Sequence, residues 1–443
     1  MIQIGIVEEF CAESKWKHIP AKRLFRNLKY VNDGMAETNR LALTMKGVIN
    51  RALDDSEGLQ SSDYSGYQIF EEGDLVFKLI DLENIKTSRV GLVHERGIMS
   101  PAYIRLSEIS NNLYSKFYYW YFFALYLNNI YNKLGGGIRQ NLTPKELLEV
   151  PVPKIDTERQ ITIANFLDRE TTRIDKLIAE KKTFIKLLKE KRQALISHVV
   201  TKGLDAKVKM KDSGVEWIGE VPEGWGHGKI KYIARVSNGA TPNRDTNEFW
   251  DGGTVGWLNS SKVNDIYIEN ADQFITELAV EKTSVQSVKP NDLVMAITGE
   301  GQTRGRVAIC KAHVTINQHL AAISVTRKQI NVEYLFFWLT SQYLRIRYES
   351  SGAGSTKGAI TCTDIGCYPV PMPPRAEQEL IVSAVKENLS SHDELQRETE
   401  SSIKFLQEHR TALISAAVTG KIDVRSQVPT SPDRPQPQES AHA

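Results

Sequence analysis

The residues of this chain best suited to chemistry lie in short loops that combine glycine, hydroxyl, amide and cationic side chains. The stretch GEGQTRGRVAI, from Gly299 to Ile309, is the richest of them. Its glycines allow a backbone to approach a phosphate closely, and Arg304 and Arg306 could neutralise that phosphate or form paired hydrogen bonds with a guanine edge. Gln302 and Thr303 lie in the same loop. On this motif alone, a hairpin turn with solvated arginines is the favoured interpretation.

Two other loops carry polar groups of the same kinds. The stretch NSSK supplies hydroxyls and a cation that suit a phosphate, in Ser260, Ser261 and Lys262. Its structural alternative is an Asx- or Ser-type turn. The stretch INQH supplies amides, which can pair with adenine through two hydrogen bonds, and an imidazole, in Asn317, Gln318 and His319. All three side chains could equally cap backbone groups in a loop.

A further pair of loops places a cation among glycines. GSTKG contains Thr356 and Lys357, and GGIRQN contains Arg139, Gln140 and Asn141. Arg139 and Lys357 are candidates for phosphate contacts because they occupy equivalent positions, 357 − 139 = 218, in two otherwise divergent stretches. The alternative is that these loops only let the chain turn into the PVP segments that follow.

The offset of 218 extends over much of the chain. KRQALISHVV, from Lys191, recurs as HRTALISAAV, from His409, and the two arginines differ by 410 − 192 = 218. Gln160 recurs as Gln378, and EEGDLVF faces KPNDLVM. SRVGLV meets GRVAIC one residue out of step. A period this long indicates a duplicated module of a domain plus a helix, not a solenoid.

The helical part of each module is long and amphipathic. The segments from about Thr157 to Thr201 and from about Ala376 to Thr419 contain no proline or glycine, so each could form a helix on the order of 65 Å long. Apolar residues at steps of three, four and seven form one stripe on each segment. The predicted pairing residues are Leu167, Ile174, Ile178, Ile185, Leu188 and Leu195 on the first helix, and Val385, Leu395, Ile403, Leu406 and Leu413 on the second.

These stripes predict that the two helices pack against each other. Burying five or six aliphatic side chains per helix, at roughly 1.5–3 kcal/mol each, is ample to drive association. Antiparallel pairing is favoured because it relates the two modules by a pseudo-twofold axis and keeps their globular parts from competing for space. The alternative is that each helix folds back on its own domain. The mixed strand and helix patterns elsewhere predict an α+β fold.

Composition and motifs exclude several classes of function. No Asn/Asp-Pro-Pro-aromatic tetrapeptide of adenine methyltransferases and no GxxxxGK[ST] phosphate loop is present, and no catalytic residue is predicted. The histidines and cysteines form no metal-binding pattern. The longest apolar run is too short to span a membrane. Acidic residues near the N-terminus argue against export and predict a cytoplasmic protein. The net charge of +2 does not by itself favour nucleic acid.

Several motifs together resemble the specificity subunit of type I restriction–modification systems. They are DSGVEWIGEVPEGW from Asp212, NGATPNR from Asn238, FWDGGTVGWLNSSKV from Phe249, GEGQTRGRVAI, INQH and the two helices that end in ALIS. The resemblance adds Thr241 and Arg244 to the candidate DNA-binding residues. The first module lacks a copy of DSGVEWIGEVPEGW and echoes it only in Trp16.

The resemblance implies an organisation and a set of partners. It implies a first target recognition domain at 1–150, a conserved long helix at 151–203, a second recognition domain at 204–370 and a second conserved helix at 371–424. The tail at 425–443 is proline-rich and polar, which predicts disorder. The resemblance implies a non-catalytic subunit that binds double-stranded DNA, two methyltransferase (M) subunits and restriction (R) subunits. S-adenosylmethionine, ATP and Mg²⁺ would belong to those partners, and no cofactor or metal to this chain.

Two similar heads on a rigid spacer would read two marks at a set distance. Divergence between the heads predicts two different marks and therefore an asymmetric, bipartite site with an unread middle. The alternative is a two-headed coiled-coil adaptor that grips proteins and has no DNA specificity, which the nearly neutral net charge permits.

Overall fold

A computed structural model of the chain describes residues 5–12, 14–53, 63–80, 82, 88–110, 112–134, 141–299, 301–351 and 358–425. The predicted tail therefore lies, except for Arg425, outside the described residues. Contacts divide the chain into a first unit, Met1–Lys181 with Glu400–Ala443, and a second unit, Lys182–Thr399. These units do not follow the five-part division expected from the sequence, because each long helix contributes residues to both of them.

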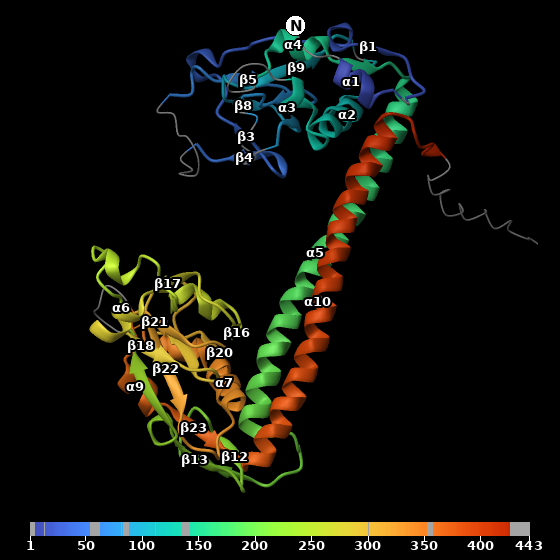
Figure 1. Ribbon diagram of the computed structural model, residues 1–443. Coiled ribbons are helices and arrows are strands. Elements are labelled where there is room, and N and C mark those ends of the chain that lie inside the picture. The colour runs from blue at the N-terminus through green and yellow to red at the C-terminus, as the bar shows by residue number, and fades with distance from the viewer. Residues whose placement is uncertain are drawn as a thin grey trace, which may run out of the picture. The chain divides into compact units, whose positions relative to one another are not determined.

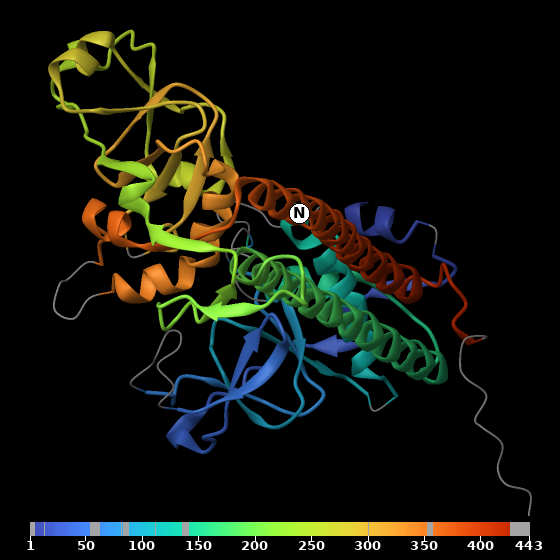
Figure 2. The ribbon, with the colours of Figure 1, turned by 90° about the horizontal axis from the view of Figure 1, so that it is seen from below.

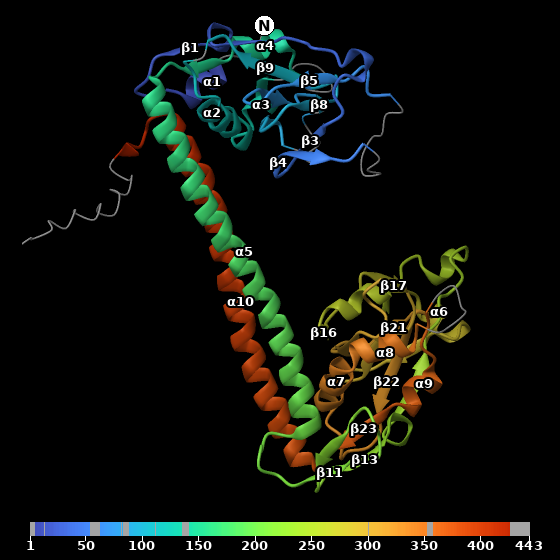
Figure 3. The ribbon, with the colours of Figure 1, turned by 180° about the vertical axis from the view of Figure 1, so that it is seen from behind.

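Two helices far longer than the others dominate the secondary structure, as predicted. They are α5 (Thr157–Lys202) and α10 (Arg375–Val418). Figures 1 and 3 show α5 in green beside α10 in red, and Figure 2 shows them adjacent from below. No helix within the described residues is both long enough and apolar enough to cross a membrane.

Ion pairs define the direction of helix pairing inside each unit. In the first unit, Arg410 Nη2 donates to Asp175 Oδ2 at 3.1 Å. In the second unit, Arg192 Nη1 donates to Asp393 Oδ1 at 2.5 Å. Both pairs have the same sum of residue numbers, 410 + 175 = 585 and 192 + 393 = 585. A constant sum means antiparallel helices in one register, which confirms the predicted direction.

The seam between the helices follows a heptad pattern. Steps of four and three connect ten buried or half-buried positions on α5, and adding 218 to each gives the ten on α10. The α5 positions are Leu167, Thr171, Ile174, Ile178, Lys181, Ile185, Leu188, Arg192, Leu195 and Val199. The α10 positions are Val385, Leu389, His392, Gln396, Thr399, Ile403, Leu406, Arg410, Leu413 and Ala417.

The prediction was wrong for one residue of the seam. Leu395 is 39% exposed, because it precedes the seam position Gln396 by one residue and so points about 100° away from the seam line. Leu389 and Thr399, which the sequence reasoning passed over, are buried instead. Ten of the eleven predicted residues lie on the seam.

The two units contain equivalent pairs of sheets, except that the second unit adds an edge strand, β16, to one of them. In the first unit the strand orders are β2-β9-β6-β7 and β4-β3-β8-β5, and in the second unit they are β14-β22-β19-β20-β16 and β17-β15-β21-β18. The equivalence extends to strand direction, since β3 pairs in parallel with β8 as β15 does with β21, while the neighbouring pairs are antiparallel. The duplication seen in the sequence is therefore a duplication of topology.

The first unit contains these strands and helices besides its parts of α5 and α10. Its strands are β1 (His18–Pro20), β2 (Phe25–Arg26), β3 (Arg40–Thr44), β4 (Gly47–Arg51), β5 (Gln68–Phe70), β6 (Leu75–Phe77), β7 (Val90–Leu92), β8 (Gly97–Met99), β9 (Ile104–Glu108) and β10 (Pro151–Pro153). Its helices are α1 (Gly5–Phe10), α2 (Ser115–Leu127), α3 (Ile130–Leu134) and α4 (Pro144–Glu149), with 3₁₀ turns η1 (Ala21–Arg23) and η2 (Asp33–Met35).

The second unit is built from the following elements. Its strands are β11 (Met210–Asp212), β12 (Glu220–Pro222), β13 (Gly226–Lys229), β14 (Ala234–Asn238), β15 (Val255–Leu258), β16 (Tyr267–Ile268), β17 (Gln273–Ile275), β18 (Gln286–Val288), β19 (Leu293–Ala296), β20 (Val307–Cys310), β21 (Val314–Ile316), β22 (Leu320–Val325) and β23 (Pro369–Met372). Its helices are α6 (Glu277–Lys282), α7 (Val332–Ser341), α8 (Tyr343–Glu349) and α9 (Cys362–Cys367), with 3₁₀ turns η3 (Ile230–Tyr232), η4 (Asn247–Phe249) and η5 (Ser260–Asn264).

An aromatic helix anchors the core of each unit. In the first unit Phe117 and Phe122 of α2 are buried against residues of β6 and β7. In the second unit Trp338 of α7 is fully buried among residues of β19, β20 and β22, and Figure 3 shows α7 and α8 beside that sheet. Because these helices are apolar almost all round, they need burial on more than one face.

A buried glutamine holds the start of each long helix. Gln160 accepts a hydrogen bond from Tyr114 N at 2.7 Å and donates to Ile155 O at 2.9 Å. Gln378 accepts from Asn331 N at 2.7 Å and donates to Pro373 O at 2.8 Å. A buried amide needs both kinds of partner, so the repeated glutamine is a structural residue in both units.

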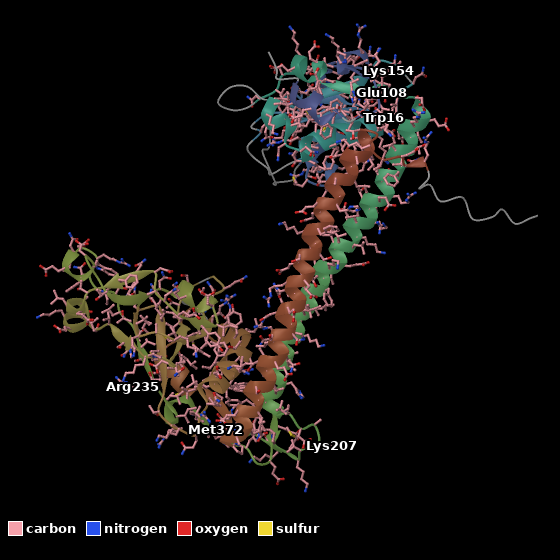
Figure 4. The ribbon with its side chains drawn as sticks, turned by 45° about the vertical axis from the view of Figure 1, so that its right-hand side comes forward. Trp16, Glu108, Lys154, Lys207, Arg235 and Met372 are labelled. Atoms are coloured by element: carbon pink, nitrogen blue, oxygen red, sulfur yellow. The ribbon has the colours of Figure 1, made fainter. Side chains whose placement is uncertain are left out.

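Each long helix also ends in the same way. Gly203 follows α5 with φ +78°, and Gly420 follows α10 with φ +72°, a left-handed conformation that favours glycine after a helix. Trp225 lies against Gly203, and Trp16, labelled in Figure 4, lies against Gly420. Trp16 is therefore the structural counterpart of Trp225, which explains its isolated echo in the sequence.

Candidate nucleic-acid interface

The turn between β21 and β22 presents polar side chains in the second unit. Leu320 N donates to Asn317 O at 3.1 Å and closes the turn. The Asn317 side chain accepts from His319 N at 3.0 Å and is only 5% exposed. Asn317 thus caps the turn from inside, which corrects its assignment as a residue that contacts DNA. Gln318 and His319 point outward and are exposed.

A chain of side-chain contacts surrounds this turn. Thr241, in the loop that follows β14, donates to Gln318 Oε1. Gln318 Nε2 lies 3.3 Å from His319 Nε2, and His319 Nδ1 lies 2.7 Å from Thr298 Oγ1. The structure therefore brings three predicted residues, Thr241, Gln318 and His319, together with Thr298, which sequence reasoning missed because it follows a buried strand with no motif of its own.

Arg244 is held in a second exposed arrangement nearby in the same loop. Its guanidinium lies 3.8 Å from the ring centroid of Trp250 and 4.9 Å from that of Trp257, and Nη2 donates to Gln273 Oε1 at 2.9 Å. Stacking on indoles fixes the plane of the guanidinium while leaving its remaining N–H groups available. The side chain is thus oriented before any ligand arrives.

Gly301 and Gln302, in the segment between β19 and β20, are hydrogen-bonded to side chains of α8. Tyr343 Oη donates to Gln302 O at 2.5 Å, and Arg347 Nη1 donates to Gly301 O at 2.6 Å. The Thr303 carbonyl accepts from Arg306 N at 2.9 Å, which makes this stretch a turn. The Arg306 side chain donates to Asn264 Oδ1 at 2.8 Å and remains half-buried.

Arg304 does not lie at the surface. Like that of Asn317, its prediction as a residue that contacts DNA is therefore corrected. Arg304 is 4% exposed and packs under the backbone of Gly358, where a Cβ would come within 1.6 Å of its Nη1. A side chain at position 358 would therefore have to displace the Arg304 guanidinium. Of the two arginines in this loop, only Arg306 retains access to solvent.

The NSSK stretch forms the Asx turn that was its structural alternative. Asn259 Oδ1 accepts from the backbone and hydroxyl of Ser261, at 2.9 and 2.6 Å, and η5 begins at Ser260. Lys262 Nζ lies 2.6 Å from Asp272 Oδ1. Since its charge already has a partner, Lys262 is a weaker candidate for a phosphate than its sequence indicated.

The two loops with glycine-flanked cations are described only in part. Arg139, Gln140, Thr356 and Lys357 lie outside the described residues. Asn141 is described and exposed, and it leads into α4. Both loops are followed by matching capping boxes, Thr143 with Glu146 and Thr361 with Asp364, the latter starting α9. Hydrogen bonds from the Thr143 backbone and side chain hold the pKa of the Glu146 carboxyl below its usual value.

The first unit has the same turn with different side chains. Between β8 and β9, Tyr103 N donates to Ser100 O at 3.1 Å, and Ser100 Oγ accepts from Ala102 N at 3.3 Å. This repeats the turn of Asn317 at an offset of 317 − 100 = 217. Pro101 and Ala102 stand where the second unit has Gln318 and His319. Sequence reasoning missed this turn, although the one-residue slip already visible in SRVGLV would have located MSPAYI opposite INQHLA.

Three cysteines among the described residues are in surroundings that lower their reactivity. Burial raises the pKa of the thiols of Cys11, Cys310 and Cys362, which favours the unreactive protonated form. Within the described part of the chain, no three His, Cys, Asp or Glu side chains gather as metal ligands.

Comparison with known proteins points to one family. The model of the type I restriction modification DNA specificity domain matches residues 222–404. The type I restriction enzyme EcoR124I/EcoR124II specificity subunit of Escherichia coli is 24% identical over 314 residues, which cover 67% of this chain and 70% of the relative. The putative type I restriction enzyme MjaX specificity subunit of Methanocaldococcus jannaschii is 22% identical over 289 residues, which cover 65% of this chain and 62% of the relative.

Solved structures resemble the fold over nearly the whole chain. One, from work on complex assembly and conformational transition of the type I R-M system, matches with a TM-score of 0.71 and 14% identity over 93% of this chain and 99% of its own. The HsdS subunit from Thermoanaerobacter tengcongensis matches with a TM-score of 0.55 and 13% identity over 92% of this chain and 97% of its own. Residues 222–404 thus match the DNA specificity domain of type I restriction–modification systems, and the fold of the chain, with its duplicated sheets and paired helices, resembles these solved structures.

Proposed function

We propose that this chain reads a bipartite, asymmetric site in double-stranded DNA, with one unit for each half-site. The observation that carries the proposal is the equivalent turn in the two units, whose backbone is the same and whose exposed side chains differ. A shared backbone lets both units approach a duplex in the same way. Different side chains at the same place then select different bases.

The helices α5 and α10 set the separation between the half-sites. Support for this part comes from their single antiparallel register, since the residue numbers of the paired positions add up to 585 in both units. It also comes from α5, which runs unbroken over 46 residues, or about 70 Å. A continuous helix transmits a fixed distance and a fixed rotation, whereas a flexible linker would not.

The chain itself performs no catalysis and docks the subunits that do. It binds two methyltransferase subunits and, in the complete complex, restriction subunits, and S-adenosylmethionine, ATP and Mg²⁺ are bound by those partners in the cytoplasm. The duplicated helical elements support this stoichiometry, because a pseudo-twofold repeat offers two equivalent docking positions. The adaptor alternative is not favoured, since the specificity-domain model matches much of the second unit and α10 as far as Lys404.

Selection from a random pool of duplex DNA tests the reading of a bipartite site. The full chain is incubated with the pool, and the retained molecules are sequenced. We expect two short, unlike motifs at a constant separation. A pool that emerges unenriched, or enriched in one motif alone, would contradict the proposal.

Insertion of one heptad into each helix tests the spacer. The insertions follow Lys181 and Thr399, so that the pairs Arg192–Asp393 and Asp175–Arg410 keep their local register. Seven residues add about 10 Å, so the unread gap should grow by about three base pairs. The matched control is seven residues inserted into the loop 203–209, outside the helices, which should leave the gap unchanged. An unaltered gap after the helix insertions would remove the helices as the spacer.

A further inference from the structure

Gln318 is an exposed side chain that is nevertheless held on two sides. An exposed glutamine ordinarily samples many rotamers, and ordering it on binding costs free energy. Here Thr241 donates to Oε1, and His319 lies 3.3 Å from Nε2. The three residues come from two loops, one after β14 and one between β21 and β22. The amide is therefore oriented by tertiary structure before a ligand binds.

The donors and acceptors around Gln318 define one arrangement. An amide nitrogen only donates, so His319 Nε2 accepts from Gln318 Nε2. The His319 proton then resides on Nδ1 and is donated to Thr298 Oγ1, at 2.7 Å. Thr298 follows β19, the strand beside β22. It holds the His319 ring in place, and the ring in turn holds the Gln318 amide.

The remaining donor and acceptor of the Gln318 amide complement the edge of one base. Of its two lone pairs and two N–H groups, Thr241 uses one lone pair and His319 one N–H. After these contacts with described residues, one lone pair remains on Oε1 and one N–H on Nε2, and both atoms are bonded to the same carbon. In the major groove adenine presents a donor at N6 beside an acceptor at N7, which is the complement of that pair, whereas guanine presents two acceptors.

We infer that Gln318 reads an adenine in the half-site of the second unit, with Thr241 and His319 as positioning residues. This inference rests on the proposed function and adds to it the base and the residue. The first unit carries Pro101 and Ala102 at the equivalent turn, neither of which offers a side-chain donor or acceptor, so it cannot make this contact from the same place. The adenine contact at this turn belongs to one half-site.

Replacing Gln318 tests the inference by changing a single base preference. The full chain and its Gln318→Glu variant are each incubated with a random duplex pool, and retained sequences are compared position by position. A carboxylate only accepts, so one adenine of one motif should give way to cytosine, whose N4 donates. Gln318→Met should lose the preference at that position by about 5- to 150-fold without gaining another. The second motif and the gap should not change.

Two further variants separate base reading from general damage. Gln329→Glu makes the same chemical change in the loop that follows β22, at the opposite end of that strand, and should leave both motifs intact. Thr241→Val removes the hydroxyl without changing side-chain size and should relax the preference for that adenine alone. A loss of binding to all sequences would instead mark Thr241 as structural and overturn its positioning role.

The outcomes distinguish the inference from the function beneath it. If the unaltered chain retains no motif, the proposed function fails. If it retains two motifs and Gln318→Glu shifts no base, the function stands and the inference about Gln318 is wrong. If the shift occurs at a base other than adenine, Gln318 is a reading residue and the assignment of adenine is wrong.

Discussion

The two units place the same turn where the chain passes from one sheet to the other, yet only one of them has exposed hydrogen-bonding side chains on it. Gln318 and His319 in the second unit face Pro101 and Ala102 in the first. The capping residue beneath is polar in both, Asn317 or Ser100. Backbone geometry is thus retained where it sets the turn, and side chains differ where they meet solvent. An asymmetric reader can arise from a symmetric duplication by changing a few exposed residues.

A second difference lies inside the sheets. In the first unit Asp74 forms a buried ion pair with Arg105, with Nε–Oδ2 at 2.5 Å, and it also accepts from Glu71 N at 2.7 Å. In the second unit the equivalent Asp292 keeps the backbone contact, from Lys289 N at 2.9 Å, but Ala322 stands where Arg105 would be. The turn function of the aspartate is common to both, and the buried charge pair is peculiar to one.

The largest expected effect follows from that difference. Arg105→Ala leaves a buried carboxylate uncompensated and should lower the unfolding free energy of the first unit by about 3–5 kcal/mol. Hydrogen exchange, read separately for amides of each unit, measures it. Protection in the second unit, which has alanine at this place, should stay as it was. A loss well under 1 kcal/mol would mean that the Asp74 carboxylate is satisfied without Arg105.

The glycines after the long helices should differ in a graded way. Gly420→Ala and Gly203→Ala each force a left-handed alanine, at a cost of about 1–2 kcal/mol. The added Cβ comes within 2.6 Å of the Trp16 ring at Gly420 but stays 3.3 Å from Trp225 at Gly203. Gly420→Ala should therefore be the more destabilising of the two in urea unfolding. Equal losses would show that the Trp16 ring yields to the new methyl group.

Equivalent ion pairs on the helices should give equal and small effects. Asp393→Arg and Asp175→Arg each bring two arginines together, and each pair contributes about 0.2–1 kcal/mol because its members are partly exposed. Adding Arg192→Asp to the first variant, or Arg410→Asp to the second, should restore stability. Double-mutant cycles at low and high salt measure both couplings. Couplings of opposite sign would break the pseudo-twofold equivalence of the two pairs.

The smallest effect concerns pH and only the first unit. Burial lowers the pKa of His18 on β1, against a weaker opposing effect of its hydrogen bond with the Trp16 backbone. The folded unit therefore binds this proton less readily than the unfolded chain does. The contribution of His18 to the unfolding free energy is complete above pH 6.5, the usual pKa of histidine. It declines as the pH falls from there through the lowered pKa of the folded unit. Urea midpoints across this range measure it, and His18→Asn should flatten the profile. A profile that stays equally steep would assign the dependence to other groups.

Periodicity in the sequence predicted the scaffold well. The ends of both long helices, their antiparallel pairing and the duplication could be read directly, because they depend on patterns repeated over many residues. Leu395 shows the limit of that reading. An apolar residue one step from the seam looks equivalent in sequence, and only the register of the pair decides which of the two neighbours is buried.

The candidate site could be predicted only as a list of loops. Arg304 and Arg306 are two residues apart in one motif, yet the first is buried beneath Gly358 and the second reaches solvent. Asn317 and Gln318 are adjacent, yet one caps the turn and the other faces outward. No local pattern separates such neighbours, since the partners that orient them come from distant segments.

The amino-acid sequence by itself determined that this chain holds one module twice, each with a long amphipathic helix, because heptad spacing and a constant offset are properties of order along the chain. Tertiary structure alone decided which polar residues face outward and how they are held. Thr241, Thr298 and Gln318 meet only when strands far apart in sequence become neighbours in a sheet. The orientation of a reading group depends on such long-range contacts, so it emerges only when the sheet has formed.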